Sequence, residues 1–194
     1  MHFTSEFIQE SLKIIKKIDQ NSIDQVINIV SETRENNGRI FFIGAGGSAA
    51  NASHAVNDFR KLANIECYSP TDNVAELTAR TNDEGWDSTF SGWLKVSKLN
   101  SKDLIFVFSV GGGNIEKNVS PNIVEAISLA KSVKSKIVGV VGRDGGYTKS
   151  NADACILIPT ENPKHVTPMT ESLHVLMWHL IITHPKIAVN KTKW

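Results

Sequence analysis

Short apolar runs alternate along the chain with longer segments of mixed character. The runs cover residues 39–43, 103–108, 136–141 and 154–158, and a shorter one covers 66–68. Each run is separated from the next by enough residues to hold a helix, which is typical of parallel strands joined by helical crossovers. The sequence therefore predicts an α/β fold with a five-stranded parallel sheet and helices on both faces.

Apolar residues with a helical period precede the first strand and follow the last one. The first group spans residues 5–18 and 23–29 and predicts two helices that pack on another subunit or over the sheet. The closing helix is predicted over 166–182. Its expected core stripe consists of Val166, Met169, Leu173, Leu176, Met177, Leu180 and Ile181. We expect one domain over 1–194, with helices in 1–36 and the α/β core in 39–184, because 194 residues are too few for two domains of ordinary size.

Composition narrows the class of function. Lys and Arg (21) nearly balance Asp and Glu (20), and no basic run stands out, so the electrostatic footprint of a nucleic-acid binder is missing. No apolar stretch is long enough for a membrane span. Cys67 and Cys155 do not form a C-x-x-C pair, and no leader-like segment opens the chain. We expect a cytoplasmic protein that acts on a small molecule.

A glycine turn links the first strand to the next helix. Gly44, Gly46 and Gly47 allow a sharp turn and a close ligand approach, and the free N–H groups of a following helix favour a phosphate. His54 and Asp58 then stand one helical turn apart on one face and could hold a metal. Two alternatives stay open here. The pair could be an ordinary helix-surface contact, or the turn could be a dinucleotide fingerprint of the form G-x-G-x-x-A, with Glu66 as the ribose-binding acid.

A second glycine loop follows the strand over 103–108. Ligands of open parallel sheets bind outside the carboxyl ends of the strands, so loops on neighbouring strands could cradle one ligand. The amides of Gly111–Gly113 suit a phosphate, although an ordinary tight connection is the alternative. The later segment 142–146 is interpreted mainly as a loop, from which Arg143 could approach an anion.

Polar residues interrupt the stripe of the closing helix. Glu171 and His179 are eight residues apart, which leaves them roughly 80° apart around the helix axis and about 12 Å along it. Both can reach one site only at the edge of the stripe. By spacing alone His174 is an equally good partner for Glu171.

These segments together resemble the sugar isomerase (SIS) domain family, and within it the phosphoheptose isomerases, over nearly the whole chain. The family's G-N-G-G-S-A-x-x-A-x-H-x-x-x-E appears as the segment from Gly44 to Asp58, with Asp58 at the position of the Glu. The family's T-D-x-S-x-L-T-A-x-x-N-D appears over 71–83. Its closing Q-E-x-H-x-x-x-x-H places Glu171 at the Gln and His179 at the last His.

The resemblance implies a single, doubly wound, flavodoxin-like SIS domain with an N-terminal helical extension. It implies a homotetramer with the N-terminal helices in the interface. It also implies a metal site, usually zinc, built from His54, Asp58, Glu171 and His179. The residues implied to bind the sugar phosphate are Gly46, Gly47, Ser48, Asn82, Asp83, Ser109, Gly111, Asn114 and Glu171.

The implied activity is the conversion of sedoheptulose 7-phosphate to D-glycero-D-manno-heptose 7-phosphate through an enediol, for heptose and surface polysaccharide synthesis. Asp58 is then the base and His179 the complementary acid/base. The chain departs from the family where Asp58 replaces Glu and where Ser109-Val110-Gly111-Gly112-Gly113-Asn114 replaces S-T-S-G-N-S. These departures favour the alternative of a non-catalytic SIS module that senses sugar phosphates or binds the replication initiator protein.

Overall fold

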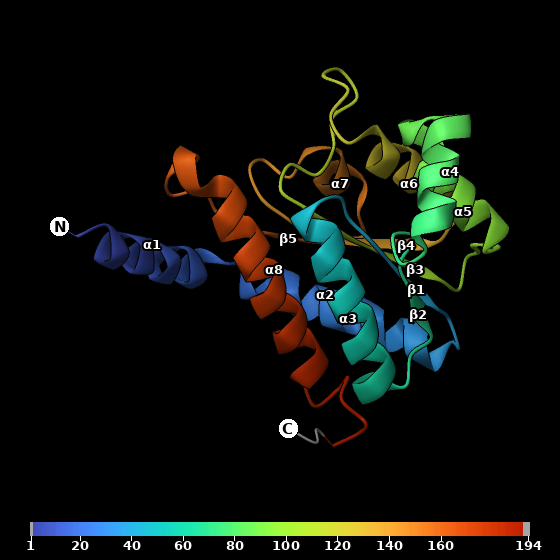
Figure 1. The fold of residues 1–194 in the computed structure, drawn as a ribbon. Helices are drawn as coiled ribbons and strands as arrows, with labels where there is room; N and C mark the ends of the chain where they lie inside the picture. Colours follow the sequence, from blue (N-terminus) through green and yellow to red (C-terminus); the bar gives the residue numbers. More distant parts are fainter. Residues whose placement is uncertain (1, 192–194) are drawn as a thin grey trace.

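Five parallel strands form one sheet in the order β2-β1-β3-β4-β5 in the computed structural model, which describes residues 2–191 (Figure 1). The strands are Ile40–Ile43 (β1), Cys67–Tyr68 (β2), Leu104–Ser109 (β3), Lys136–Val141 (β4) and Ala154–Leu157 (β5). The predicted strands are confirmed to within one residue at either end. This strand order is the flavodoxin-like one, in which the chain reverses its winding direction between β1 and β3.

Helices occupy most of the remaining chain. They are Phe3–Lys17 (α1), Gln20–Glu35 (α2), Gly47–Ala63 (α3), Val74–Glu84 (α4), Thr89–Val96 (α5), Pro121–Ser132 (α6), Gly146–Asn151 (α7) and Val166–Thr183 (α8). Short 3-10 turns at Trp86–Ser88 and Pro163–His165 lead into α5 and α8. Among the described residues, no helix is both long and apolar enough to cross a membrane.

Both faces of the sheet are covered, because alternate residues of each strand point into different clusters. Phe42 and Phe106 face a cluster built with α2, α3 and α8, whereas Phe41 and Ile105 face a cluster built with α5 and α6. The strands are accordingly apolar almost throughout, as expected for a sheet buried on both sides. The doubly wound α/β prediction is confirmed.

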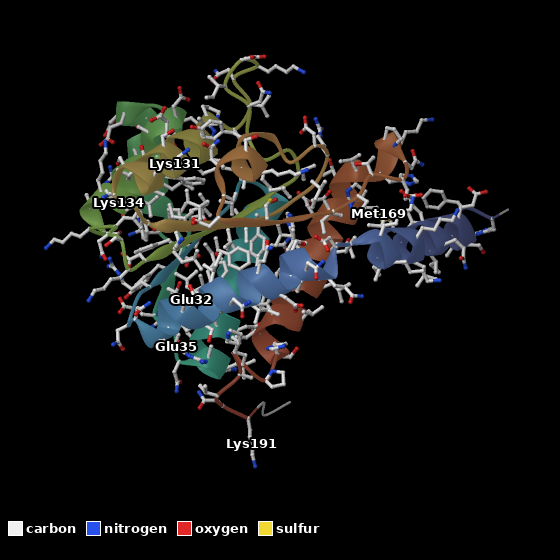
Figure 2. The ribbon with its side chains drawn as sticks, turned by 180° about the vertical axis from the view of Figure 1, so that it is seen from behind. Glu32, Glu35, Lys131, Lys134, Met169 and Lys191 are labelled. Atoms are coloured by element: carbon white, nitrogen blue, oxygen red, sulfur yellow. The ribbon has the colours of Figure 1, made fainter. Side chains whose placement is uncertain are left out.

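The N-terminal helices behave differently from one another. Helix α2 lies across one face of the sheet, whereas α1 projects to the side of the body (Figure 1 and Figure 2). At the junction, the Ser11 hydroxyl donates to the sulfur of Met169 at the start of α8 over 3.3 Å. Further contacts are the 2.7 Å pair between Glu10 and His165 and the 2.6 Å pair between Lys17 and Glu161.

Several apolar side chains remain exposed outside the core. On α1 they are Phe3, Ile8, Leu12 and Ile15. The core stripe predicted for α8 is wrong at Leu176 and Leu180, which are also exposed. The helix turns these two positions away from the sheet, whereas Trp178, which the stripe omitted, is fully buried.

Candidate functional site

Helices α3 and α8 pack side by side and run in the same direction away from the carboxyl edge of the sheet (Figure 1). Gly46 precedes α3 with a φ of 62°, a conformation that glycine adopts without strain, so the chain leaves β1 and turns directly into the helix. Because the two helices are parallel, successive residues of α3 contact successive residues of α8. Gly47 lies against Glu171, the Asn51 amide donates to the Glu171 carbonyl over 2.9 Å, and lower down α3 meets the end of α8.

His54, Asp58 and His179 converge at that lower contact. The Asp58 Oδ2 atom lies 3.6 Å from the His54 Nε2 and 3.3 Å from the His179 Nε2. One potential ligand atom from each residue falls within 4.8 Å of the other two. Asp58 is almost fully buried, whereas about half of each histidine side chain is exposed, so the group opens to solvent through its imidazoles.

The geometry of this group suits a small divalent cation. A tetrahedral zinc ion with bonds of about 2.0–2.1 Å holds neighbouring ligand atoms roughly 3.3 Å apart. The two distances from Asp58 Oδ2 to the histidines, 3.3 and 3.6 Å, are close to that value. Two imidazole nitrogens and one carboxylate oxygen are also the donor set of catalytic zinc sites, which keep a fourth position open. The residues present therefore fit zinc.

Glu171 lies elsewhere on the same helix pair. Its carboxylate atoms lie 2.5–2.7 Å from the point where a Cβ on Gly47 would stand, so it occupies the space beside the first turn of α3. The favourable end of the helix dipole meets a carboxylate there. Among the described residues, the group that could hold a metal contains His54, Asp58 and His179, and the role of Glu171 as a fourth ligand stays a prediction.

His174 is buried between the helices and the sheet. Its ring lies 5.0 Å from that of Phe108, and its Nδ1 faces the Asn51 amide at 3.4 Å. Within residues 2–191 its Nε2 has no hydrogen-bond partner, and burial lowers the pKa of this imidazole to about 4. His174 is therefore a neutral core residue in the folded protein, outside the group that could bind a cation.

The second glycine loop follows β3 and interlocks with the turn after β4. The Ser109 hydroxyl accepts a hydrogen bond from the Gly112 amide over 2.9 Å, and the Gly112 carbonyl accepts from the Thr148 amide over 2.8 Å. Gly112 has a φ of 71°, and its missing side chain lets the Gly145 carbonyl pass close by. Backbone packing between two loops thus accounts for part of the glycine run, and it holds the loop rigidly at the switch point of the sheet.

Arg143 stands beside this loop. It has a φ of 52°, a backbone conformation that non-glycine residues seldom adopt and that concentrates at functional sites. Its side chain is exposed, and its Cδ passes 3.8 Å from the point where a Cβ on Gly111 would stand. The position places a guanidinium group next to the glycine loop, at the carboxyl edge of the sheet.

The other predicted binding residues lie on separate elements. Asn114 pairs with Val119 in an isolated antiparallel bridge and lines an open hollow of about 380 Å³ together with Asp144 and Tyr147. Asn82 and Asp83 lie in the last turn of α4, exposed, and the Asn82 amide donates to the Asp83 carboxylate over 2.7 Å. Ser48 is buried in the first turn of α3. The structure brings none of these into the group around Asp58, and their binding roles stay predictions.

The dinucleotide interpretation of the first turn is wrong in its choice of Glu66 as the ribose-binding acid. In the register of β1 and β2, Ile40 pairs with Cys67, so Glu66 precedes β2 at the amino edge of the sheet. A ribose-binding acid would have to lie at the carboxyl edge, where the glycine turn is. The Glu66 carboxylate instead accepts a hydrogen bond from the Tyr68 hydroxyl over 2.9 Å.

Two contacts of Asp58 were missed from the sequence. The Trp178 indole Nε1 donates to Asp58 Oδ2 over 3.2 Å, and the Asn57 amide donates to Asp58 Oδ1 over 3.0 Å. Asn57 adjoins Asp58 in the chain and could have been noticed. Trp178 lies in an apolar helix, and nothing in the sequence around it indicates that its indole N–H contacts a carboxylate.

Comparison with known proteins agrees with this architecture. A model of the SIS domain matches residues 5–142. The phosphoheptose isomerase of Aliarcobacter butzleri is 30% identical over 184 residues, which cover 91% of both chains. That of Helicobacter pylori (strain ATCC 700392 / 26695) is 28% identical over 183 residues, covering 91% of this chain and 90% of its own length.

A solved structure is also similar over nearly the full length. The phosphoheptose isomerase from Neisseria gonorrhoeae superposes with a TM-score of 0.79 at 25% identity and covers 92% of this chain and 95% of its own. The sequence matches, the strand order and the solved structure agree with one another. The chain belongs to the SIS domain family, in the group of the phosphoheptose isomerases, and is an isomerase.

Proposed function

We propose that this protein is a metal-assisted ketose–aldose isomerase that converts sedoheptulose 7-phosphate to D-glycero-D-manno-heptose 7-phosphate. The observation that carries the proposal is the convergence of His54, Asp58 and His179 on one point, beside a helix that starts at a glycine turn. The relatives from Aliarcobacter butzleri and Helicobacter pylori are phosphoheptose isomerases, which supports a seven-carbon sugar phosphate as the substrate. The product would serve heptose synthesis for surface polysaccharide.

The separation between the glycine turn and the histidines supports a long sugar phosphate. At about 1.5 Å per residue, His54 lies roughly 10 Å and Asp58 roughly 16 Å along the helix axis from Gly47. A phosphate held near either glycine loop would therefore stand far from the reacting carbons. Sedoheptulose 7-phosphate carries its carbonyl and its phosphate near opposite ends, as that distance requires.

The proposed chemistry moves a proton between two adjacent carbons through an enediol. Asp58, as a carboxylate base, would take the proton from C1 and return it to C2, while His179, as the complementary acid/base, would carry a proton from the C1 hydroxyl to the C2 carbonyl oxygen. The substrate reaches Asp58 from the side of the two imidazoles, because the rest of the carboxylate is buried. Zinc held by His54, Asp58 and His179, with Glu171 as a further candidate ligand, would polarise the substrate carbonyl.

Phosphate recognition would fall to the two glycine loops. The hydroxyls that the family carries in the second loop are reduced here to Ser109, which already accepts from the Gly112 amide. We assign the phosphate to backbone amides near Gly46 and Gly111, with Arg143 as the neighbouring positive charge. Asn82, Asp83 and the remaining predicted residues would complete the sugar contacts.

Oligomerisation is a separate part of the proposal. Helix α1 projects from the body (Figure 1). Its side chains Ile8, Leu12 and Ile15 are exposed and form an apolar stripe. Burial of this stripe in a homotetramer would remove apolar surface from water. Light scattering at micromolar concentration tests the assembly, and a monomer would exclude sites shared between subunits. We also place the protein in the cytoplasm, in keeping with its unpaired cysteines, Cys67 and Cys155.

The decisive experiment pairs metal analysis of the purified protein with conversion of sedoheptulose 7-phosphate. It uses the wild type, Asp58→Asn and His179→Ala, with His184→Ala as a matched control outside the metal-competent group. We expect metal-dependent turnover that both site variants lose and the control keeps. Bound metal without turnover would refute the substrate, and absence of both metal and turnover would favour the non-catalytic SIS module.

A further inference from the structure

Trp178 makes an unusual contact with the carboxylate at the centre of the site. The residue is fully buried, and its indole Nε1 donates to Asp58 Oδ2 over 3.2 Å. The same oxygen faces the His179 Nε2 at 3.3 Å and the His54 Nε2 at 3.6 Å. Three nitrogens from three residues thus surround one carboxylate oxygen, and only the indole N–H is a permanent donor.

The surroundings of Trp178 fix the direction of this donor. Its ring lies 5.2 Å from the His54 ring, 5.1 Å from the His179 ring and 5.8 Å from the Phe108 ring. A large, rigid side chain packed on these sides has little freedom to turn, so its N–H points at Asp58 in a set orientation. A buried indole N–H without an acceptor would also carry a desolvation cost, which the carboxylate removes.

The other carboxylate oxygen is held separately. Asp58 Oδ1 accepts a hydrogen bond from the Nδ2 atom of the Asn57 side chain over 3.0 Å. The two donors therefore approach different oxygens and resist rotation of the carboxylate about χ2. A carboxylate oxygen has two lone-pair positions, so Oδ2 keeps one free for a cation between the histidines while the indole occupies the other.

We propose that Trp178 is a positioning residue that presents Asp58 Oδ2 to the bound metal ion as a single-atom ligand. The inference rests on the metal site of the proposed function, though not on its substrate. An aspartate is shorter than the glutamate of the family pattern and cannot reach as far from the helix. The Trp178 N–H holds this shorter carboxylate at the distance from both histidines that a zinc ion requires.

Trp178→Phe tests the inference, because it removes the N–H while keeping an aromatic ring in the core. Loss of such an outer contact typically lowers metal affinity about 10–100-fold. We expect zinc affinity, measured by competition with a chelating dye, to fall within that range. The absorption spectrum of the cobalt-substituted protein should change as well, because it reports the ligand geometry. Trp93→Phe is the matched control, since Trp93 packs against Phe41 in the other core cluster.

A double-mutant cycle separates positioning from general loosening of the fold. If Trp178 acts through Asp58, Trp178→Phe should change zinc affinity less than about twofold in an Asp58→Ala background, which has no oxygen to accept the indole N–H. Equal losses in both backgrounds, or an equal loss in Trp93→Phe, would overturn the inference. Thermal unfolding of the metal-free variants verifies folding, and Trp178→Leu, which also lacks a donor, replaces Trp178→Phe if that variant does not fold.

The outcomes also distinguish this inference from the proposed function. If the wild type and Trp178→Phe bind zinc with the same affinity, only the role of Trp178 is overturned. If Trp178→Phe binds zinc more weakly than the wild type, and the wild type does not turn over sedoheptulose 7-phosphate, the role of Trp178 is supported and the proposed substrate is refuted. A wild type without affinity for zinc would overturn both.

Discussion

His174 makes the acid stability of this protein predictable. The side chain is fully buried beside Phe108, its Nε2 has no hydrogen-bond partner among the residues that the structure describes, and burial lowers its pKa from 6.5 to about 4. In the folded protein the imidazole stays neutral down to about pH 4. In the unfolded chain it is solvated and takes up a proton near its ordinary pKa of about 6.5.

The sign and size of the effect follow from this difference in proton uptake. Between pH 6.5 and pH 4 the unfolded state binds more protons at this residue, so the free energy of unfolding falls as the pH falls. At about 1.4 kcal/mol per pH unit, the full window corresponds to roughly 3 kcal/mol, and the part between pH 7 and pH 4.5 to about 2 kcal/mol. The contribution of His174 to the free energy of unfolding is therefore greatest above pH 6.5.

Denaturant unfolding of the wild type and His174→Gln at pH 7 and pH 4.5 measures the effect. Glutamine is neutral throughout and can still accept a hydrogen bond from Asn51, so the variant should lose about 2 kcal/mol less than the wild type over this interval. Carboxylates contribute equally to both proteins and cancel in the difference. His2→Gln, at an exposed histidine, should behave as the wild type does. Equal losses in the wild type and His174→Gln would refute the assignment of a neutral buried imidazole.

Three further predictions concern the glycine loops and their charged neighbours. Gly112→Ala should lower the free energy of unfolding by more than Gly46→Ala in denaturant titrations, because both positions have positive φ but only Gly112 has a carbonyl oxygen in the way. Equal costs would contradict the loop packing. Glu171→Gln should bind inorganic phosphate several-fold more tightly than the wild type by calorimetry, because it removes a negative charge beside Gly47; unchanged affinity would place the phosphate elsewhere. Arg143→Gln should raise KM for the sugar phosphate and leave kcat nearly unchanged, since the charge binds substrate and transition state alike. A fall in kcat alone would argue against that role.

Much of the fold could be predicted because the sheet is buried on both faces. Its strands are then continuous apolar runs, which stand out in the sequence and reappear as β1, β3 and β4 with nearly the predicted bounds. The pair of His54 and Asp58 could be predicted in the same way, because residues four apart on a helix share a face. Which residues complete their site depends on how α8 lies against α3, and local spacing cannot determine that.

Glu171 and His179 illustrate the limit. Eight residues place them about 12 Å apart along one helix, so joining both to one ion requires side chains that bend toward each other. In the structure α8 runs parallel to α3, so its residues meet α3 in order: Glu171 faces the first turn at Gly47, and His179 meets Asp58. Parallel packing thus places Glu171 and His179 at different levels of α3, and the role of Glu171 as a fourth ligand stays a prediction.

The meaning of the glycine run was equally hidden in the sequence. Three adjacent glycines indicate that the backbone must be approached closely, but a ligand and another loop make the same demand. Here β3 and β4 are neighbours in the sheet, and the turn after β4 fills part of the space above Gly112. Gly112 and Gly113 therefore serve packing, and anion binding by Gly111 beside Arg143 stays a prediction.

The replacement of glutamate by Asp58 is best understood together with Trp178. Viewed alone, the shorter side chain looks like a loss of reach at the centre of the site, where a displacement of about 1 Å can cost about 100-fold in rate. The structure places a fully buried indole donor on the same oxygen that faces both histidines, and an amide donor on the other oxygen. A short carboxylate with both oxygens held has fewer orientations than a long one held by none. The aspartate is therefore compatible with a well-ordered metal site, and its precision depends on Trp178 rather than on the length of its own side chain.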